Sequence, residues 1–302
     1  MHIPVLLNEV IEYLDPKANE NFVDCTIGQG GHTKVILEKN APNGKVLGID
    51  LDAKQIENCK LLKREFGERL ILVNDNYANL TDIINKNNFT KVNGILADIG
   101  FSSFQIEGST RGFSFLKDEN LDMRYSTEIT NDKLQITNTL TAKKIVNEFS
   151  QQELEKILEE YGEERFAKQI AKKITEERKI NKIETTFELV EVIKKAIPAK
   201  FQYDRIHCAT RTFQALRIAV NGELENLKKF LPQALSVLSS DGRLVIISFH
   251  SLEDRIVKNY FKQEAEKGTI KILTKKPIEA TEGEINNNAR ARSAKLRAIV
   301  KL

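Results

Sequence analysis

The fold is decided by the stretch Asn21-Phe-Val-Asp-Cys-Thr-Ile-Gly-Gln-Gly-Gly-His-Thr33. Residues 21–27 are mostly apolar and predict a buried strand, and the helical pattern of Val35, Ile36 and Leu37 follows after the glycines. A glycine-rich turn at this point lets the backbone approach a ligand closely and aims helix N–H groups at it. The stretch predicts the first strand, turn and helix of an α/β sheet, although a turn that only packs a helix against a strand remains an alternative.

Strand-like and helical patterns alternate outward from this stretch, as is typical of a doubly wound, mostly parallel sheet. Further strands are expected at residues 45–50, 69–73, 92–99, 243–249, 270–274 and 296–302. The last two could form a hairpin-like pair that finishes the sheet. We therefore expect an α/β fold with a sheet of about seven strands.

A long interval between Gly100 and Gly242 interrupts this alternation, and it is several times longer than an ordinary crossover. It has helical signals, because Ser150-Gln-Gln-Glu153 and Thr185-Thr-Phe-Glu188 both match the capping box that begins a helix. An extra domain inserted into the sheet explains the length. We expect a discontinuous α/β domain at residues 1–108 and 207–302 and an inserted, mainly helical domain at residues 109–206.

The composition excludes several classes of protein. Lys and Arg number 46 against 43 Asp and Glu, and the net charge of +3 is too small to identify a nucleic-acid binder. No apolar run approaches the roughly 18 residues of a membrane helix, and the chain opens without a signal-type segment, so we expect a cytoplasmic protein without membrane contact. The 3 cysteines and 4 histidines lack ligand spacing, which predicts neither disulfides nor a metal site.

Polar residues end the next three expected strands. Asp50 can accept both ribose hydroxyl hydrogens of an adenosine, and Tyr77 could stack on the adenine ring. Asp98 would lie beside a transferred methyl group, although it could instead be a plain helix cap. A nicotinamide fingerprint asks for a small residue where this chain has Thr33. The pattern favours a sulfonium methyl donor, S-adenosylmethionine, over a nicotinamide.

Candidate substrate contacts lie further along the chain. Ser248, Phe249, His250 and Ser251 stand at the end of the fifth strand, where a base flipped out of its stack needs aromatic or polar walls, although His250 could equally be a structural histidine. A helical stripe of polar residues and two basic stretches, 166–182 and 285–302, could hold RNA, although a solvated face is an equally simple explanation. The stripe comprises Thr210, Gln214, Arg217 and Asn221.

Several long blocks stand in order along the chain: Gly28-Gln-Gly-Gly-His-Thr33, Ala97-Asp-Ile-Gly-Phe-Ser-Ser103, Arg111-Gly-Phe-Ser-Phe115, Leu121-Asp-Met-Arg124, Gly162-Glu-Glu-Arg-Phe-Ala-Lys168, Ala209-Thr-Arg-Thr-Phe-Gln-Ala215, Ile247-Ser-Phe-His-Ser-Leu-Glu-Asp-Arg255 and Ala289-Arg-Ala-Arg-Ser-Ala-Lys-Leu-Arg297. Together with the opening His2-Ile-Pro-Val-Leu-Leu7, these blocks resemble the RsmH (MraW) family of rRNA cytosine-N4 methyltransferases. The resemblance spans essentially the whole chain.

The resemblance implies a class I (Rossmann-like) methyltransferase domain that carries an inserted helical substrate domain. It implies a cofactor site at Gly30, Gly31, His32, Asp50, Tyr77, Asp98 and Gln105. The family commonly has Phe where this chain has Tyr77, so only the stacking carries over. Phe104 and Cys208 stand where Pro is usual, and Gly222 where an acidic or polar residue is usual. None of these departures removes an implied cofactor contact, but Phe104 can change the path of the loop that carries Gln105.

We therefore expect methyl transfer from S-adenosylmethionine to the N4 amine of a cytidine in the decoding region of 16S rRNA. The expected setting is the small ribosomal subunit, and a homodimer is possible. Asp98 is expected to orient the acceptor amine, and His250 to line the base pocket. Expected RNA contacts are Arg124, Arg211, Gln214, Arg217, Ser248, Phe249, Arg290 and Arg292. Methylation of DNA or protein, and a purely structural assembly factor that binds S-adenosylmethionine, remain alternatives.

Overall fold

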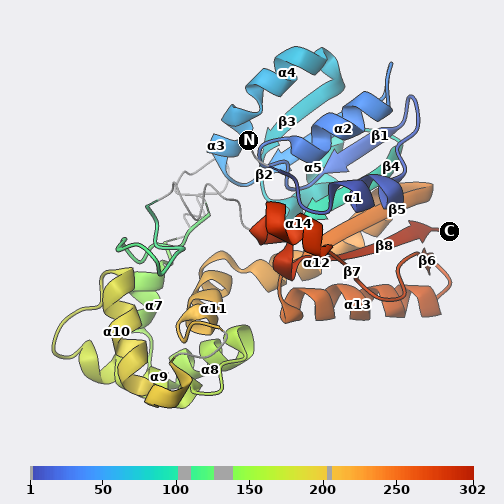
Figure 1. Ribbon diagram of the computed structural model, residues 1–302. Helices are drawn as coiled ribbons and strands as arrows, with labels where there is room; N and C mark the ends of the chain where they lie inside the picture. Colours follow the sequence, from blue (N-terminus) through green and yellow to red (C-terminus); the bar gives the residue numbers. More distant parts are fainter. Residues whose placement is uncertain (1–2, 101–109, 126–138, 203–205) are drawn as a thin grey trace. The chain divides into compact units, whose positions relative to one another are not determined.

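The computed structural model describes residues 3–100, 110–125, 139–202 and 206–302 (Figure 1). Its contacts divide the chain into two compact units, residues 1–100 with 224–302 and residues 101–223. The sequence analysis bounded the inserted domain at residues 109 and 206, so the observed helical unit is longer at both ends. It includes helix α11 (Thr210–Asn221), because Phe213, Leu216 and Val220 of that helix join the core of the helical unit.

The first unit is built on an eight-stranded sheet in the order β3-β2-β1-β4-β5-β8-β6, with β7 paired to β8. The strands β1 to β5 are mutually parallel, and β8 runs antiparallel to β5, β6 and β7. The predicted α/β fold with a mostly parallel sheet is confirmed. The strands are β1 (Asn21–Asp24), β2 (Val46–Asp50), β3 (Leu70–Asn74), β4 (Val92–Asp98), β5 (Leu238–Ser248), β6 (Ile270–Ile272), β7 (Ile278–Glu279) and β8 (Lys295–Lys301).

Each expected strand corresponds to an observed one, and β7 is the strand that the sequence analysis did not expect. It has 2 residues, too few for an alternation of apolar and polar side chains to be recognised. The strand expected at residues 270–274 ends at Ile272, and the strand expected to begin at residue 243 begins at Leu238. β6 and β8 do pair antiparallel, as expected of the last two strands.

Both faces of the sheet are buried, because successive side chains of a strand point to opposite faces. Phe22 of β1 packs into one apolar cluster with α1, α2 and β8, while Val23 packs into another with α5, α12 and α13. Helices on both faces are what the near-continuous apolar strands predict. The helices of this unit are α1 (Leu7–Leu14), α2 (Gly31–Lys39), α3 (Ala53–Asn58), α4 (Lys60–Phe66), α5 (Leu80–Lys86), α12 (Glu223–Val237), α13 (Ser251–Glu266) and α14 (Glu282–Asn287).

The second unit is helical and has its own apolar core. Both expected capping boxes are present, one formed by Ser150 with Glu153 and one by Thr185 with Glu188. Gly162 lets α8 approach α11 closely, because a Cβ at this position would lie 2.7 Å from the carbonyl oxygen of Arg211. Besides α11, the described residues of this unit form α7 (Ala142–Glu148), α8 (Gln151–Gly162), α9 (Ala167–Glu177), α10 (Thr186–Ala196) and the short η3 (Ala199–Phe201).

Among the described residues of both units, no helix combines the length and the apolar character needed to span a bilayer.

Candidate active site

The turn after β1 needs glycine both for its backbone conformation and for its close packing. Gly28 and Gly30 have positive φ angles of 52° and 76°, which glycine adopts without steric cost. A Cβ on Gly30 would lie 2.6 Å from Cδ2 of Leu62, and one on Gly31 would lie 2.4 Å from Cγ of Pro4. The space around Gly28 is open, so its conformation alone favours glycine there. The turn brings the N-terminus of α2, which begins at Gly31, to the carboxyl end of β1.

Asp50, at the end of β2, faces this turn. Its Oδ2 accepts a hydrogen bond from the backbone N–H of Gly28 at 2.9 Å, and its Oδ1 accepts one from that of Asp52 at 2.9 Å. A carboxylate has about four acceptor positions, so both oxygens can accept further hydrogen bonds from a ligand. Burial raises the pKa of Asp50 to about 7, against the lowering effect of these N–H groups. The side chain therefore suits a ligand that donates hydrogen bonds.

Asp24, at the end of β1, is a site residue that the sequence analysis missed. Its side chain is almost fully buried, and it accepts hydrogen bonds from Oγ1 of Thr33 at 2.6 Å and from the N–H of Thr26 at 3.2 Å. Burial raises the pKa of Asp24 to about 6. A charged residue inside an apolar strand, just before a glycine turn, was the signal that could have identified it.

Asp98 ends β4, next to β1 in the sheet. Its backbone N–H donates to Oγ1 of Thr26 at 2.8 Å, which ties the two strand ends together. Burial raises the pKa of Asp98 to about 6, while the nearby His32 and the N–H of Gly100 act to lower it. Asp24 also raises the pKa of Asp98, because the two negative charges lie close enough to repel each other.

His32 lies in the first turn of α2 and is buried. Its Nε2 is 2.9 Å from the carbonyl oxygen of Val5, so Nε2 carries the hydrogen and donates it. Burial lowers the pKa of His32 from the usual histidine value, although Asp98 acts in the opposite direction. Through this hydrogen bond the imidazole anchors the N-terminal segment beside the glycine turn.

Tyr77 begins a short 3₁₀ turn, η2 (Tyr77–Asn79), after β3. Its ring is partly exposed and meets the ring of Phe230 on α12 in an edge contact, with centroids 5.2 Å apart at 82°. This contact fixes the ring at the carboxyl edge of the sheet, where stacking on a planar ligand is possible. Gln105, the remaining expected cofactor residue, lies outside the described residues.

The end of β5 supplies Ser248 and Phe249. Oγ of Ser248 donates to the carbonyl oxygen of Lys295 at 3.3 Å, so its hydrogen is used within the sheet. The ring of Phe249 packs on the backbone of Gly100, because a Cβ at Gly100 would lie 2.4 Å from Cε2 of Phe249. These contacts bring the segments after β4 and β5 together, as their pairing in the sheet requires.

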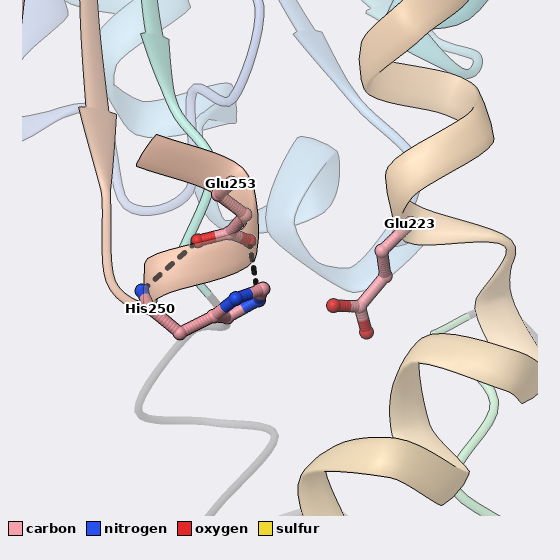
Figure 2. Close-up of side chains that lie close together, drawn as sticks. All are labelled: Glu223, His250 and Glu253. Atoms are coloured by element: carbon pink, nitrogen blue, oxygen red, sulfur yellow. Dashed lines mark hydrogen bonds and ion pairs between the residues drawn. The ribbon is translucent and has the colours of Figure 1, made fainter. Parts of the chain in front are cut away.

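His250 and Glu253 follow at the start of α13, and Figure 2 shows their contact. Nε2 of His250 lies 3.1 Å from Oε1 of Glu253. Oε2 of Glu253 accepts from the backbone N–H groups of Phe249 at 2.9 Å and His250 at 3.3 Å. The side chain of Glu253 is 4% exposed, so this carboxylate holds the turn from inside the protein. Glu253 is a second residue that the sequence analysis missed.

The expected RNA contacts on the helical unit make internal contacts. Arg124 forms a two-pronged ion pair with Asp122 at 2.6 and 2.7 Å. Arg217 forms one with Glu223, both at 2.9 Å, and these two side chains are 12% and 9% exposed. A guanidinium that is already paired with a buried carboxylate is poorly placed to bind a phosphate. The contacts of Arg217 therefore point mainly to a role in holding the helical unit together.

The other expected contacts are more accessible. Arg211 is exposed and its Nη1 donates to the carbonyl oxygen of Glu163 at 3.2 Å, whereas Nε2 of Gln214 donates to that of Tyr161 at 3.1 Å. On the first unit, Arg290 is half-buried and donates to Asn288 and to the carbonyl oxygen of Ile3, both at 3.2 Å. Arg292 is exposed.

A pocket of about 140 Å³ opens on the helical unit, and the sequence analysis did not anticipate it. The guanidinium of Arg165 lies 4.0 Å from the ring centroid of Phe201 and 4.8 Å from that of Phe166, so the wall combines cationic and aromatic groups. No periodic pattern reveals it, because its walls come from separate segments. They are Glu164, Arg165, Phe166, Ile197, Phe201, Ile206, His207, Cys208 and Arg211.

Together, Asp24, Asp50 and Asp98 place three carboxyl groups at the ends of the neighbouring strands β1, β2 and β4. Burial raises the pKa of each of them. A ligand that carries positive charge and hydroxyl groups would relieve this repulsion and satisfy the free acceptor positions. A sulfonium nucleoside such as S-adenosylmethionine has both properties.

Comparison with known proteins gives a match over the whole chain. The model of the MraW methylase family matches residues 1–302. A Clostridium botulinum protein named ribosomal RNA small subunit methyltransferase H is 46% identical, covering 100% of this chain and 99% of its own. A Thermotoga neapolitana protein of the same name is 44% identical, covering 98% and 95%. A solved rRNA methylase structure from Streptococcus thermophilus shows 10% identity and a TM-score of 0.46, covering 100% and 99%.

Proposed function

Because this chain belongs to the MraW methylase family, we propose that it transfers a methyl group from S-adenosylmethionine to the N4 amine of a cytidine in the decoding region of 16S rRNA. The observation that carries the proposal is the similarity over the full length to proteins named for methylation of small-subunit rRNA. The cluster of carboxyl groups at the strand ends supports it independently, since this edge of a doubly wound sheet is where ligands bind.

The cofactor site comprises the glycine turn and the ends of β1 to β4. Asp50 accepts hydrogen bonds from the ribose hydroxyls, and Tyr77 stacks on the adenine. The methionine part of the cofactor is lined by Gly30, Gly31 and His32. Asp98 lies next to the sulfonium methyl group, and Gln105 is the remaining residue of the proposed site. Two observations support this assignment: the Asp50 carboxylate has acceptor positions left, and the Tyr77 ring is held at the same edge. S-adenosylmethionine supplies an electrophilic methyl group when bound there.

Asp98 orients the acceptor amine. The lone pair of a cytosine N4 is delocalised into the ring, so the protein must hold the nitrogen in line with the methyl group. A hydrogen bond from the amine to the Asp98 carboxylate localises the lone pair and stabilises the positive charge that develops on nitrogen. The raised pKa of Asp98, about 6, still leaves the group mostly ionised at neutral pH.

The helical unit recognises the RNA. Its pocket of Arg165, Phe166 and Phe201 combines groups that stack on bases with groups that attract phosphates. Arg211 lies on the rim with its side chain exposed. At the other unit, Phe249, Ser248, Arg290 and Arg292 remain candidates for RNA contact, and the small subunit in the cytoplasm is the proposed setting. A homodimer is compatible with this role.

Nucleoside mass spectrometry of rRNA from cells with and without this protein tests the function. N4-methylated cytidine in small-subunit rRNA should disappear without the protein and return when the wild-type chain is expressed. Methylated DNA or protein that depends on the chain, with unchanged rRNA, would refute the proposal. Ribosome binding without any methylated product would refute it in favour of a structural role.

A further inference from the structure

The side chain of His250 is buried but has no good hydrogen bond. It is 9% exposed, and among the described residues Nδ1 has no hydrogen-bond partner, while Nε2 faces Oε1 of Glu253 at 3.1 Å without good hydrogen-bond geometry. Buried polar atoms are nearly always paired in native proteins, so the unpaired Nδ1 needs an explanation. A ring that is kept for a ligand or substrate atom provides one.

Glu253 fixes the position and the charge environment of this ring. Its Oε1 is 3.1 Å from Nε2 of His250, and its Oε2 accepts from the backbone N–H groups of Phe249 and His250 (Figure 2). A carboxylate on one side of an imidazole favours the hydrogen on the facing nitrogen and stabilises the imidazolium. Nδ1 is then left with a free lone pair.

The ring also lies at the edge of the sheet that carries Asp98. β4 and β5 are neighbours, and Asp98 pairs with Ile247, three residues before His250. Glu253 is near enough to Asp98 to raise the pKa of that carboxyl group by repulsion. An amine held by Asp98 therefore has a second potential acceptor on the adjacent strand end.

We propose that His250 is the proton acceptor of the methyl transfer and that Glu253 is its positioning residue. This inference rests on the proposed function, because it assigns the acceptor amine to a cytosine. The N4 amine carries two hydrogens, so it can donate one to the Asp98 carboxylate and the other to Nδ1 of His250. Imidazole is the side chain best suited to take a proton near neutral pH.

The proton balance is complete. The methyl carbon forms its bond to N4 as its bond to sulfur breaks, so the sulfonium becomes a neutral thioether and the positive charge moves to N4. N4 then loses one hydrogen as a proton to Nδ1 of His250, which leaves a neutral methylated amine and an imidazolium ion. Glu253 offsets the imidazolium charge until the proton passes to water. No oxidant, reductant or other reactant is needed.

Single-turnover methyl transfer on small-subunit particles, at saturating enzyme and S-adenosylmethionine, tests His250. His250→Asn keeps a polar side chain of similar width but has no basic nitrogen, and the rate should fall about 100-fold, as is typical for the loss of a general base. The dissociation constants for S-adenosylmethionine and for the particles should change less than about threefold. In His250→Ala, added imidazole should restore a measurable part of the rate, which a packing defect would not allow.

A second readout does not depend on activity. In ¹⁵N spectra of the histidine rings, His250 should carry its hydrogen on Nε2, and Glu253→Gln should shift this tautomer equilibrium while the free enzyme stays folded. Lys262→Ala is the matched control on the same helix, because this side chain is 71% exposed, and both the spectra and the rate should match wild type. The Glu253→Gln rate should fall less than that of His250→Asn.

Three results would overturn the proposal: a rate within about threefold of wild type in His250→Asn, a loss in His250→Ala that imidazole leaves unchanged, or a hydrogen on Nδ1 of the wild-type ring. If the wild-type protein methylates rRNA in the same assay, each of these results refutes only the role of His250 and leaves the proposed function intact. Failure of the wild-type protein to methylate rRNA would instead refute the proposed function, and the assignment of His250 with it.

Discussion

The carboxylate of Asp50 and the backbone N–H of Gly28 are joined by a hydrogen bond of 2.9 Å. The bond links the end of β2 to the first glycine of the turn after β1, 22 residues earlier in the chain. Cys59 adds a second link, since its Sγ lies 3.2 Å from the carbonyl oxygen of Gly28. The ribose side and the glycine turn of the candidate site are therefore one connected structure, and a change in Asp50 should affect both.

Asp50→Asn should weaken the binding of S-adenosylmethionine roughly 10- to 150-fold. Each charged hydrogen bond contributes about 1.5–3 kcal/mol, and the amide offers one acceptor oxygen in place of two. Calorimetric titration measures the effect. Asp82→Asn is the control, because this side chain is exposed on α5 and should leave the affinity unchanged. Unaltered affinity in Asp50→Asn would remove Asp50 from the ribose site.

Asp50 should make the ligand-free protein less stable as the pH rises, which is the reverse of the usual effect of a carboxyl group. The folded pKa is about 7, above the ordinary value of 3.8, so the folded state binds this proton more tightly than the unfolded state. The resulting stabilisation is complete below about pH 4 and is lost as the pH rises to about 7.

Comparison with Asp50→Asn measures this effect together with the smaller effect of the Asp50 charge on Asp24, since the remaining carboxyl groups are common to both proteins. Urea unfolding between pH 4.5 and about pH 8 should show wild type losing stability relative to the variant as the pH rises. A difference in unfolding free energy that is constant with pH, or that grows in favour of wild type, would contradict the raised pKa.

Much of the first unit could be predicted from sequence because its strands are buried on both faces and its turns are rich in glycine. Asp50 and Asp98 were identifiable as strand-end residues, since chemistry gathers at that edge of such a sheet. Asp24 and Glu253 were not identified, because their importance depends on what surrounds them: one is buried beside Thr33, and the other accepts from the turn at Phe249. Sequence spacing does not report either contact.

The RNA contacts expected of the arginines stay predictions, and sequence alone does not rank them. A polar stripe on a helix shows which residues share a face, but not which of them already have an ion-pair partner. Arg217 and Gln214 lie on the same face of α11, yet Arg217 pairs with Glu223, a residue of the segment that follows the helix. The helix ends at Gly222, with a positive φ of 60°, immediately before Glu223, and periodicity contains no information about the ion pair.

Arg217→Ala should reduce stability by about 3–5 kcal/mol, because it leaves the buried carboxylate of Glu223 without its cationic partner. The hydroxyl of Tyr125 also donates to this carboxylate, at 2.8 Å. In the variant this uncharged hydroxyl would remain as a hydrogen-bond donor to Glu223. Denaturant unfolding measures the loss, and the double variant Arg217→Ala, Glu223→Gln should recover part of it. Full stability combined with weaker binding to small-subunit particles would instead show that Arg217 contacts RNA.

Asp98→Asn separates the catalytic from the cofactor-binding role of this residue. The amide keeps the size of the side chain and one acceptor oxygen, and the N–H of Asp98 still donates to Thr26, so the pocket should persist. The negative charge that stabilises the developing charge on N4 is lost, and we expect the single-turnover rate to fall roughly 100-fold, about 2.7 kcal/mol, while the affinity for S-adenosylmethionine changes less than about tenfold. Rate assays on small-subunit particles and direct cofactor titration measure the two quantities. A near-wild-type rate would reject the catalytic role, and equal losses in rate and affinity would assign Asp98 mainly to holding the cofactor.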